Sequence, residues 1–170
     1  MEQEVRLALT GFMGVGKTSV ARHLEHMTGC RRIDLDSMIE DRAGKNIAEI
    51  IGSEGMPRFR ELESEALTRV IEANRGCILS LGGGTWTIAA NRDLIKQSGF
   101  TSVWLESSFE HCWYNIKFSR KARPLARDKE SARELFDERQ KVYCLADWHF
   151  LVKPGSTSYD VAIEIADQVL

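Results

Sequence analysis

Eight residues near the N-terminus, Gly11–Thr18, restrict the folds available to this chain more than any other stretch. They read GFMGVGKT and match G-x-x-x-x-G-K-[ST], the pattern of the phosphate-binding P-loop. The apolar run Val5–Leu9 just before them predicts a buried strand, and Lys17–Thr28 predicts a helix. Because a strand before and a helix after are the context in which this loop binds phosphate, the motif predicts an α/β nucleotide-binding fold.

The chemistry of the motif follows from its three glycines, Gly11, Gly14 and Gly16. Without a Cβ, their backbone can turn so that the N–H groups form a nest for anionic oxygens. The N-terminus of the following helix adds partial positive charge. Lys17 can reach the β- and γ-phosphates of a nucleotide, and the Thr18 hydroxyl can bind Mg²⁺. The alternative is a glycine-rich turn with a surface lysine.

The composition is typical of a soluble globular protein, with one domain spanning residues 1–170. The chain is 43% hydrophobic and 28% charged, and its formal net charge of −2 gives no global basic field for nucleic acid or anionic membranes. No N-terminal signal-peptide pattern and no membrane-spanning apolar run is present. The four cysteines lack the spacing of a zinc site, and at this size they do not suggest a disulfide framework. We therefore expect a cytoplasmic monomer without nucleic-acid or membrane partners.

Strand and helix patterns alternate along the whole chain, which predicts a parallel sheet with helices on both faces. Further strands are expected at Arg32–Asp34, Cys77–Leu81, Thr101–Leu105 and Trp148–Val152. Further helices are expected at Ser37–Ala43, Ile47–Ile51, Arg58–Ala73, Ala89–Gln97, Ser108–Ile116, Glu130–Ala146 and Tyr159–Val169. Gly52 and Gly55 are expected to separate the second and third of these.

Two carboxylates, Asp34 and Asp36, stand where the second strand ends. Ligands of open parallel sheets bind beyond the carboxyl ends of the strands. One carboxylate near a nucleotide could therefore hold a metal-bound water, and the other could accept a proton from an attacking hydroxyl. The alternative is that Asp36 only caps the helix beginning at Ser37.

The triplet Gly82-Gly83-Gly84 follows the third strand, and three glycines in a row suit a backbone that lies against a ligand. A tight turn is the alternative. Ser80, just before the triplet, could bind a metal-coordinated water or could be a small core residue. Trp86, just after it, could form a wall of the substrate site or belong to the core.

Arginines provide the remaining candidates. Arg60 and Glu63 are spaced to pair on one helix, either as a surface ion pair or as an arginine oriented toward a substrate carboxylate. Arg123 lies in the most basic part of the chain, which could be a solvated loop or a mobile lid that closes over the γ-phosphate. Arg139 lies four residues before Tyr143, a spacing that indicates nothing by itself.

Taken together, six motifs make the chain resemble the shikimate kinase family over nearly its whole length. They are the P-loop Gly11–Thr18, Asp34-Leu35-Asp36, Phe59-Arg60-Glu61-Leu62-Glu63, Gly82–Gly84, Arg123-Pro124-Leu125 and Arg139-Gln140-Lys141-Val142-Tyr143. The resemblance implies a three-layer P-loop fold with a five-stranded parallel sheet in the order 2-3-1-4-5. It also implies substrate-binding helices within about residues 34–63 and a mobile lid at about residues 117–128.

The resemblance further implies a role for each candidate residue. The catalytic residues would be Lys17, Asp36 and Arg123. The nucleotide would contact Gly11, Met13, Gly14, Val15, Gly16, Lys17, Thr18, Ser19 and Arg120. Magnesium would be held by Thr18 and Asp34, with Ser80 behind it. The acceptor would contact Asp36, Arg60, Gly82, Gly83, Gly84, Arg123 and Arg139, with Arg60 and Arg139 clamping its carboxylate.

The function implied is ATP-dependent phosphorylation of the 3-hydroxyl of shikimate to shikimate 3-phosphate, in the aromatic amino acid (chorismate) pathway. Two alternatives stay open: a kinase for another small hydroxy acid such as gluconate, and a catalytically silent nucleotide-binding regulator. The chain departs from the usual family pattern at Ile51, Met56, Ala126 and Ala146. Lys117 and Arg120 are both candidates for contacting adenine.

Overall fold

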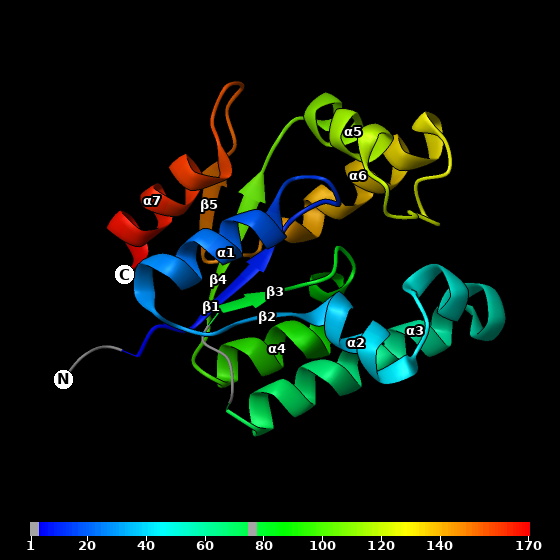
Figure 1. The fold of residues 1–170 in the computed structure, drawn as a ribbon, viewed down its shortest axis with the longest axis horizontal. Coiled ribbons are helices and arrows are strands. Elements are labelled where there is room, and N and C mark those ends of the chain that lie inside the picture. Colours follow the sequence, from blue (N-terminus) through cyan, green and yellow to red (C-terminus); the bar gives the residue numbers. More distant parts are fainter. Residues whose placement is uncertain (1–3, 75–77) are drawn as a thin grey trace.

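The computed structural model describes residues 4–74 and 78–170, and their core is a five-stranded parallel sheet (Figure 1). The strand order is β2-β3-β1-β4-β5, and every neighbouring pair is parallel. The strands are β2 (Arg32–Asp34), β3 (Ile78–Ser80), β1 (Leu7–Thr10), β4 (Thr101–Glu106) and β5 (Trp148–Leu151). The expected fold class and strand order are therefore confirmed.

Helices cover both faces of the sheet. They are α1 (Lys17–Thr28), α2 (Leu35–Ala43), α3 (Ile47–Glu72), α4 (Ala89–Gln97), α5 (Phe109–Phe118), α6 (Lys129–Tyr143) and α7 (Ser158–Val169), with a 3₁₀ turn at Thr85–Thr87. In Figure 1, α1 and α7 lie together on one side of the sheet, and α3 and α4 lie on the other. No helix within the described ranges has the length and apolar character needed to cross a membrane.

The central strands are apolar because neither of their faces reaches water. Every residue of β1 and β3 is buried, and β1 lies between β3 and β4. This explains why they read as continuous apolar runs rather than alternating patterns. The first strand begins at Leu7 rather than Val5, and Cys77, the expected start of the third strand, lies outside the described residues.

Several helix boundaries differ from the sequence-based expectation; α6, for example, ends at Tyr143 rather than Ala146. The helix after β2 begins at Leu35, two residues before Ser37, so Asp36 lies in its first turn. The segment from Ile47 to Glu72 is interrupted at Gly55 (φ 85°, ψ 165°), whereas Gly52 remains helical. Of these two glycines, only Gly55 has the left-handed φ that a residue with a Cβ rarely adopts. The chain therefore changes direction at Gly55 and not at Gly52.

Candidate active site

The P-loop connects β1 to α1 and is folded tightly against neighbouring backbone. Gly11 and Gly14 have φ values of +148° and +79°. A Cβ on Gly11 would lie 2.8 Å from the Leu105 carbonyl oxygen, and one on Gly14 would lie 2.7 Å from that of Cys112. Since both neighbours are backbone atoms, only glycine fits at either position.

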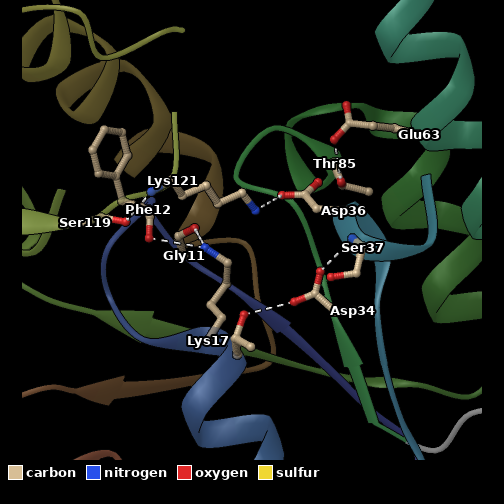
Figure 2. Close-up of polar contacts among 11 residues, drawn as sticks. Gly11, Phe12, Lys17, Asp34, Asp36, Ser37, Glu63, Thr85, Ser119 and Lys121 are labelled. Carbon is tan, nitrogen blue, oxygen red and sulfur yellow. Dashed lines mark hydrogen bonds and ion pairs between the residues drawn. The ribbon is translucent and has the colours of Figure 1, made fainter. Parts of the chain in front are cut away.

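The Lys17 side chain folds back over this loop (Figure 2). Its ammonium donates hydrogen bonds to the Gly11 carbonyl at 2.6 Å and to the Phe12 carbonyl at 3.2 Å. Burial disfavours the charged form and lowers the pKa of Lys17 to about 8, although Asp36 opposes this shift. The ammonium is therefore held at the loop whose N–H groups form the expected phosphate nest.

Asp34, at the end of β2, has both carboxylate oxygens engaged (Figure 2). One accepts a hydrogen bond from the Thr18 hydroxyl at 2.9 Å, and the other accepts one from the Ser37 backbone N–H at 3.0 Å. Asp34 is thus the N-cap of α2, and the alternative that Asp36 caps this helix is wrong. Capping by Asp34 leaves Asp36, two residues later, free to face the cavities described next.

A cavity of about 460 Å³ opens over the loop, and we call it the P-loop cavity. Its lining includes the predicted residues Met13, Gly14, Gly16, Lys17, Thr18, Ser19, Asp34, Asp36, Ser80, Gly83 and Arg123. Asn115 also lines it, from α5, and its amide donates to the Gly14 carbonyl at 2.7 Å. No sequence motif pointed to Asn115, because its contact depends on α5 packing against a loop about 100 residues earlier.

A second cavity, which we call the arginine cavity, contains the two predicted carboxylate-binding arginines, Arg60 of α3 and Arg139 of α6. Its apolar lining includes Ile47, Ile51 and Phe59. The family-variable position Ile51 therefore belongs directly to this lining.

The Arg60–Glu63 pair is not a surface ion pair. The Glu63 side chain is only 1% exposed, and it accepts hydrogen bonds from the Arg60 guanidinium and, at 2.8 Å, from the Thr85 hydroxyl. Burial raises the pKa of the Glu63 carboxyl, and Arg60 and Thr85 oppose that shift. A buried carboxylate with two donors fixes the direction in which Arg60 points.

Arg139, whose spacing from Tyr143 indicated nothing by itself, is buried, at 5% exposed. It lies beside the glycine triplet, where a Cβ on Gly83 would come within 2.8 Å of its Nη1. A Cβ on Gly84 would overlap the Arg60 guanidinium, and the Tyr143 hydroxyl donates to the Gly83 carbonyl at 2.6 Å. Gly83 and Gly84 are therefore glycine because their backbone lies against the two arginines.

The two cavities meet at five residues that line both: Met13, Asp36, Gly83, Lys121 and Arg123. Burial raises the pKa of the Asp36 carboxyl above its usual value, and Lys121 is the strongest opposing influence. The Arg123 Nε is buried and has no hydrogen-bond partner among the residues described. A buried donor of this kind is available to a bound group.

Some predicted residues lie outside the cavities. Gly11 and Val15 are buried within the loop, and Gly82 packs between the carboxylates of Asp36 and Glu63. Arg120 is exposed and lies outside both cavities as the described residues outline them.

Trp86 is fully buried, and its indole N–H donates to the Val142 carbonyl at 3.1 Å. It belongs to the core, so the expectation that it could form a wall of the substrate site is wrong.

Comparison with known proteins agrees with this geometry. The sequence model of the family described as "Shikimate kinase" matches residues 13–170. A shikimate kinase of Streptococcus thermophilus is 39% identical over 138 residues, which are 79% of this chain and 82% of the relative. One of Persephonella marina is 31% identical over 161 residues, which are 95% of this chain and 96% of the relative.

Among solved structures, this chain is similar to the shikimate kinase from Acinetobacter baumannii in complex with shikimate. The TM-score is 0.88 at 30% identity, and the match covers 99% of this chain and 97% of that chain. A gluconokinase from Sinorhizobium meliloti has a TM-score of 0.61 at 17% identity, covering 95% of this chain and 89% of that chain, a likeness of fold alone. With the P-loop, the arginine cavity and a family match from residue 13 to residue 170, the chain belongs to the shikimate kinase family.

Proposed function

We propose that this chain transfers the γ-phosphoryl group of ATP to the 3-hydroxyl of shikimate, forming shikimate 3-phosphate in the aromatic amino acid (chorismate) pathway. The observation that carries the proposal is the junction at Asp36, where the P-loop cavity meets the arginine cavity, which contains the half-buried Arg60 and the buried Arg139. Family membership supports ATP as the donor, and the shikimate named with the A. baumannii relative supports the acceptor. The cytoplasmic location and monomeric state stay predictions from the sequence.

On the donor side, the loop N–H groups and Lys17 would bind the phosphates. Thr18 and Asp34 would hold Mg²⁺, because their oxygens converge within 2.9 Å and hard oxygen donors suit this ion. The described residues contain no cluster of three or more metal-binding side chains, which fits an ion held by one carboxylate and by substrate phosphates. When bound, Mg²⁺ would neutralise charge on the β- and γ-phosphates.

On the acceptor side, Arg60 and Arg139 would bind the substrate carboxylate. Guanidinium groups are planar and can donate two parallel hydrogen bonds to one carboxylate. Both arginines lie against the Gly83–Gly84 backbone, and Glu63 orients Arg60 from behind. An acceptor clamped there would place a hydroxyl toward the junction with the P-loop cavity.

At the junction, the acceptor oxygen would form a bond to the γ-phosphorus as the bond from that phosphorus to ADP breaks. Asp36 would orient the hydroxyl and accept its proton. Its raised pKa suits this role, because a base works best when its pKa approaches the working pH. Lys17 and Arg123 would neutralise charge on the transferred group.

The experiment is ADP release measured with shikimate, quinate and gluconate as acceptors. We expect shikimate to give the highest kcat/KM. Preference for gluconate would favour the alternative hydroxy-acid kinase, and ATP binding without turnover on any acceptor would favour the silent regulator.

A variant pair tests the acceptor side directly. Arg60→Ala should lower kcat/KM for shikimate at least about 30-fold, because loss of a buried ionic partner costs roughly 2–5 kcal/mol. Arg58→Ala is the matched control, since Arg58 lies on the same helix in exposed pairs with Glu61 and Glu65. Equal behaviour of the two variants would contradict the carboxylate clamp.

A further inference from the structure

Residues 119–128 join α5 to α6, and we call them the connecting segment. Lys121 reaches from this segment into the site, as Figure 2 shows. Its backbone N–H donates to the Ser119 hydroxyl at 3.1 Å, and its Nζ lies 3.9 Å from the nearer Asp36 carboxylate oxygen.

Lys121 is also one of the five residues that line both cavities. A side chain at this position would border both the bound nucleotide and the bound acceptor. The sequence showed only that Lys121 belongs to a basic stretch, and its reach to Asp36 depends on how the connecting segment folds over the sheet end.

Two cations of the connecting segment therefore stand at the junction, and their surroundings differ. Arg123 is half-buried, whereas the Lys121 side chain is 42% exposed. At 3.9 Å the Lys121–Asp36 contact is a long ion pair, and a partly exposed pair is worth at most about 1 kcal/mol. Such a contact is easily exchanged for a stronger anionic partner, and the transferred phosphoryl group is the most highly charged group that reaches the junction.

We propose that Lys121 is a further catalytic residue. With both substrates bound, its ammonium exchanges the Asp36 carboxylate for an oxygen of the phosphoryl group in transfer, and Asp36 is released to the acceptor hydroxyl. This inference rests on the proposed function, because it assumes that the phosphoryl group passes between the two cavities at Asp36. The competing explanation is that Lys121 only forms a surface ion pair.

Three variants separate the two explanations. Lys121→Met removes the charge at nearly constant length, and Lys121→Arg retains the charge. Lys129→Met is the matched control, because Lys129 begins α6 at the far end of the same segment, pairs with Glu110 at 3.3 Å, and is exposed outside both cavities.

We expect Lys121→Met to lower kcat about 10- to 100-fold while each KM changes less than about twofold, because the contact forms with the group in transfer. Lys121→Arg should recover most of the loss, and Lys129→Met should match the wild type. A kcat for Lys121→Met within twofold of the wild type, a defect confined to KM, or an arginine variant as slow as the methionine variant would each overturn the proposal.

A binding measurement supplies a readout other than turnover. ADP with aluminium fluoride and shikimate imitates the phosphoryl group in transfer, and its affinity should fall in Lys121→Met by about the same factor as kcat. The affinity for ADP alone should not change. Unaltered affinity for the aluminium fluoride complex would overturn the proposal.

The two proposals fail in different ways. A wild-type protein without shikimate-dependent ADP release would overturn the proposed function and this inference together. An active wild type with an equally active Lys121→Met variant would overturn this inference alone.

Discussion

The two cavities are built by different means. The P-loop cavity opens over one continuous stretch, Gly11–Thr18, whose shape is fixed by glycines packed against other backbone. The arginine cavity presents side chains from α3 and α6, about 80 residues apart, which a buried carboxylate and a glycine backbone hold in place. The P-loop cavity is therefore built from residues close in the sequence, whereas the arginine cavity depends on the packing of distant helices. Variants in each cavity should reveal this difference.

The largest effect is expected at Lys17, the main side-chain cation of the P-loop cavity. Lys17→Ala should lower kcat/KM for ATP about 10²–10³-fold, because it removes a positioned charge from the phosphates. Its circular dichroism spectrum should stay unchanged, since the glycines still shape the loop. Lys45→Ala, at an exposed lysine between α2 and α3, is the control. A loss below tenfold would show that the backbone nest alone suffices.

A smaller effect is expected from Arg139→Lys in the arginine cavity. Lysine keeps the charge but not the two-pronged donor geometry, so kcat/KM for shikimate should fall about 10- to 30-fold. The KM for ATP should stay within twofold. Arg133→Lys is the control, because Arg133 lies on the same helix in an exposed pair with Asp137. Full activity of Arg139→Lys would mean that charge alone recognises the acceptor.

Asn115 should give a still smaller effect, confined to the donor. Asn115→Ala removes the hydrogen bond to Gly14, and one such bond is worth about 0.5–1.5 kcal/mol, so the KM for ATP should rise about 2- to 10-fold. The KM for shikimate should not change. Asn115→Asp should be worse, because a carboxylate would face the Gly14 carbonyl. Equal effects on both substrates would contradict the separation of the two cavities.

The smallest effect on catalysis is expected at Trp86. Trp86→Phe should leave kcat and the tryptophan fluorescence response to shikimate unaltered, because the indole is buried and bonded to Val142. Stability should fall by about 1 kcal/mol from the lost hydrogen bond, measured by urea unfolding. A fluorescence response that disappears in this variant would place Trp86 at the acceptor after all.

The sequence allowed prediction of features that depend on neighbouring residues. The P-loop could be recognised because its glycines, Lys17 and Thr18 act within eight residues, and alternating patterns predicted a parallel sheet. The strand order came from the family resemblance, since alternation alone does not fix which strands pair. The sequence did not show which of Gly52 and Gly55 interrupts the helix, and only their backbone angles distinguish them.

Features that depend on contacts between distant residues could not be predicted from the sequence. The sequence suggested Asp36 as the alternative cap of α2, whereas the hydrogen bond from Ser37 shows that Asp34 is the cap. The positions of Asn115 and Lys121 depend on how α5 and the connecting segment lie against the P-loop and Asp36. Long-range contacts of this kind leave no periodic signal in the chain.

The glycine triplet has a consequence for how this protein could be redesigned or could diverge. Any side chain at Gly83 or Gly84 would compete with a guanidinium for the same space, so that part of the cavity cannot be remodelled without losing an arginine. The apolar part of the lining, Ile47, Ile51 and Phe59, contains ordinary side chains whose size can change. Selection for a bulkier or smaller acid would therefore act on this part of the lining, by a few kcal/mol for each methylene gained or lost.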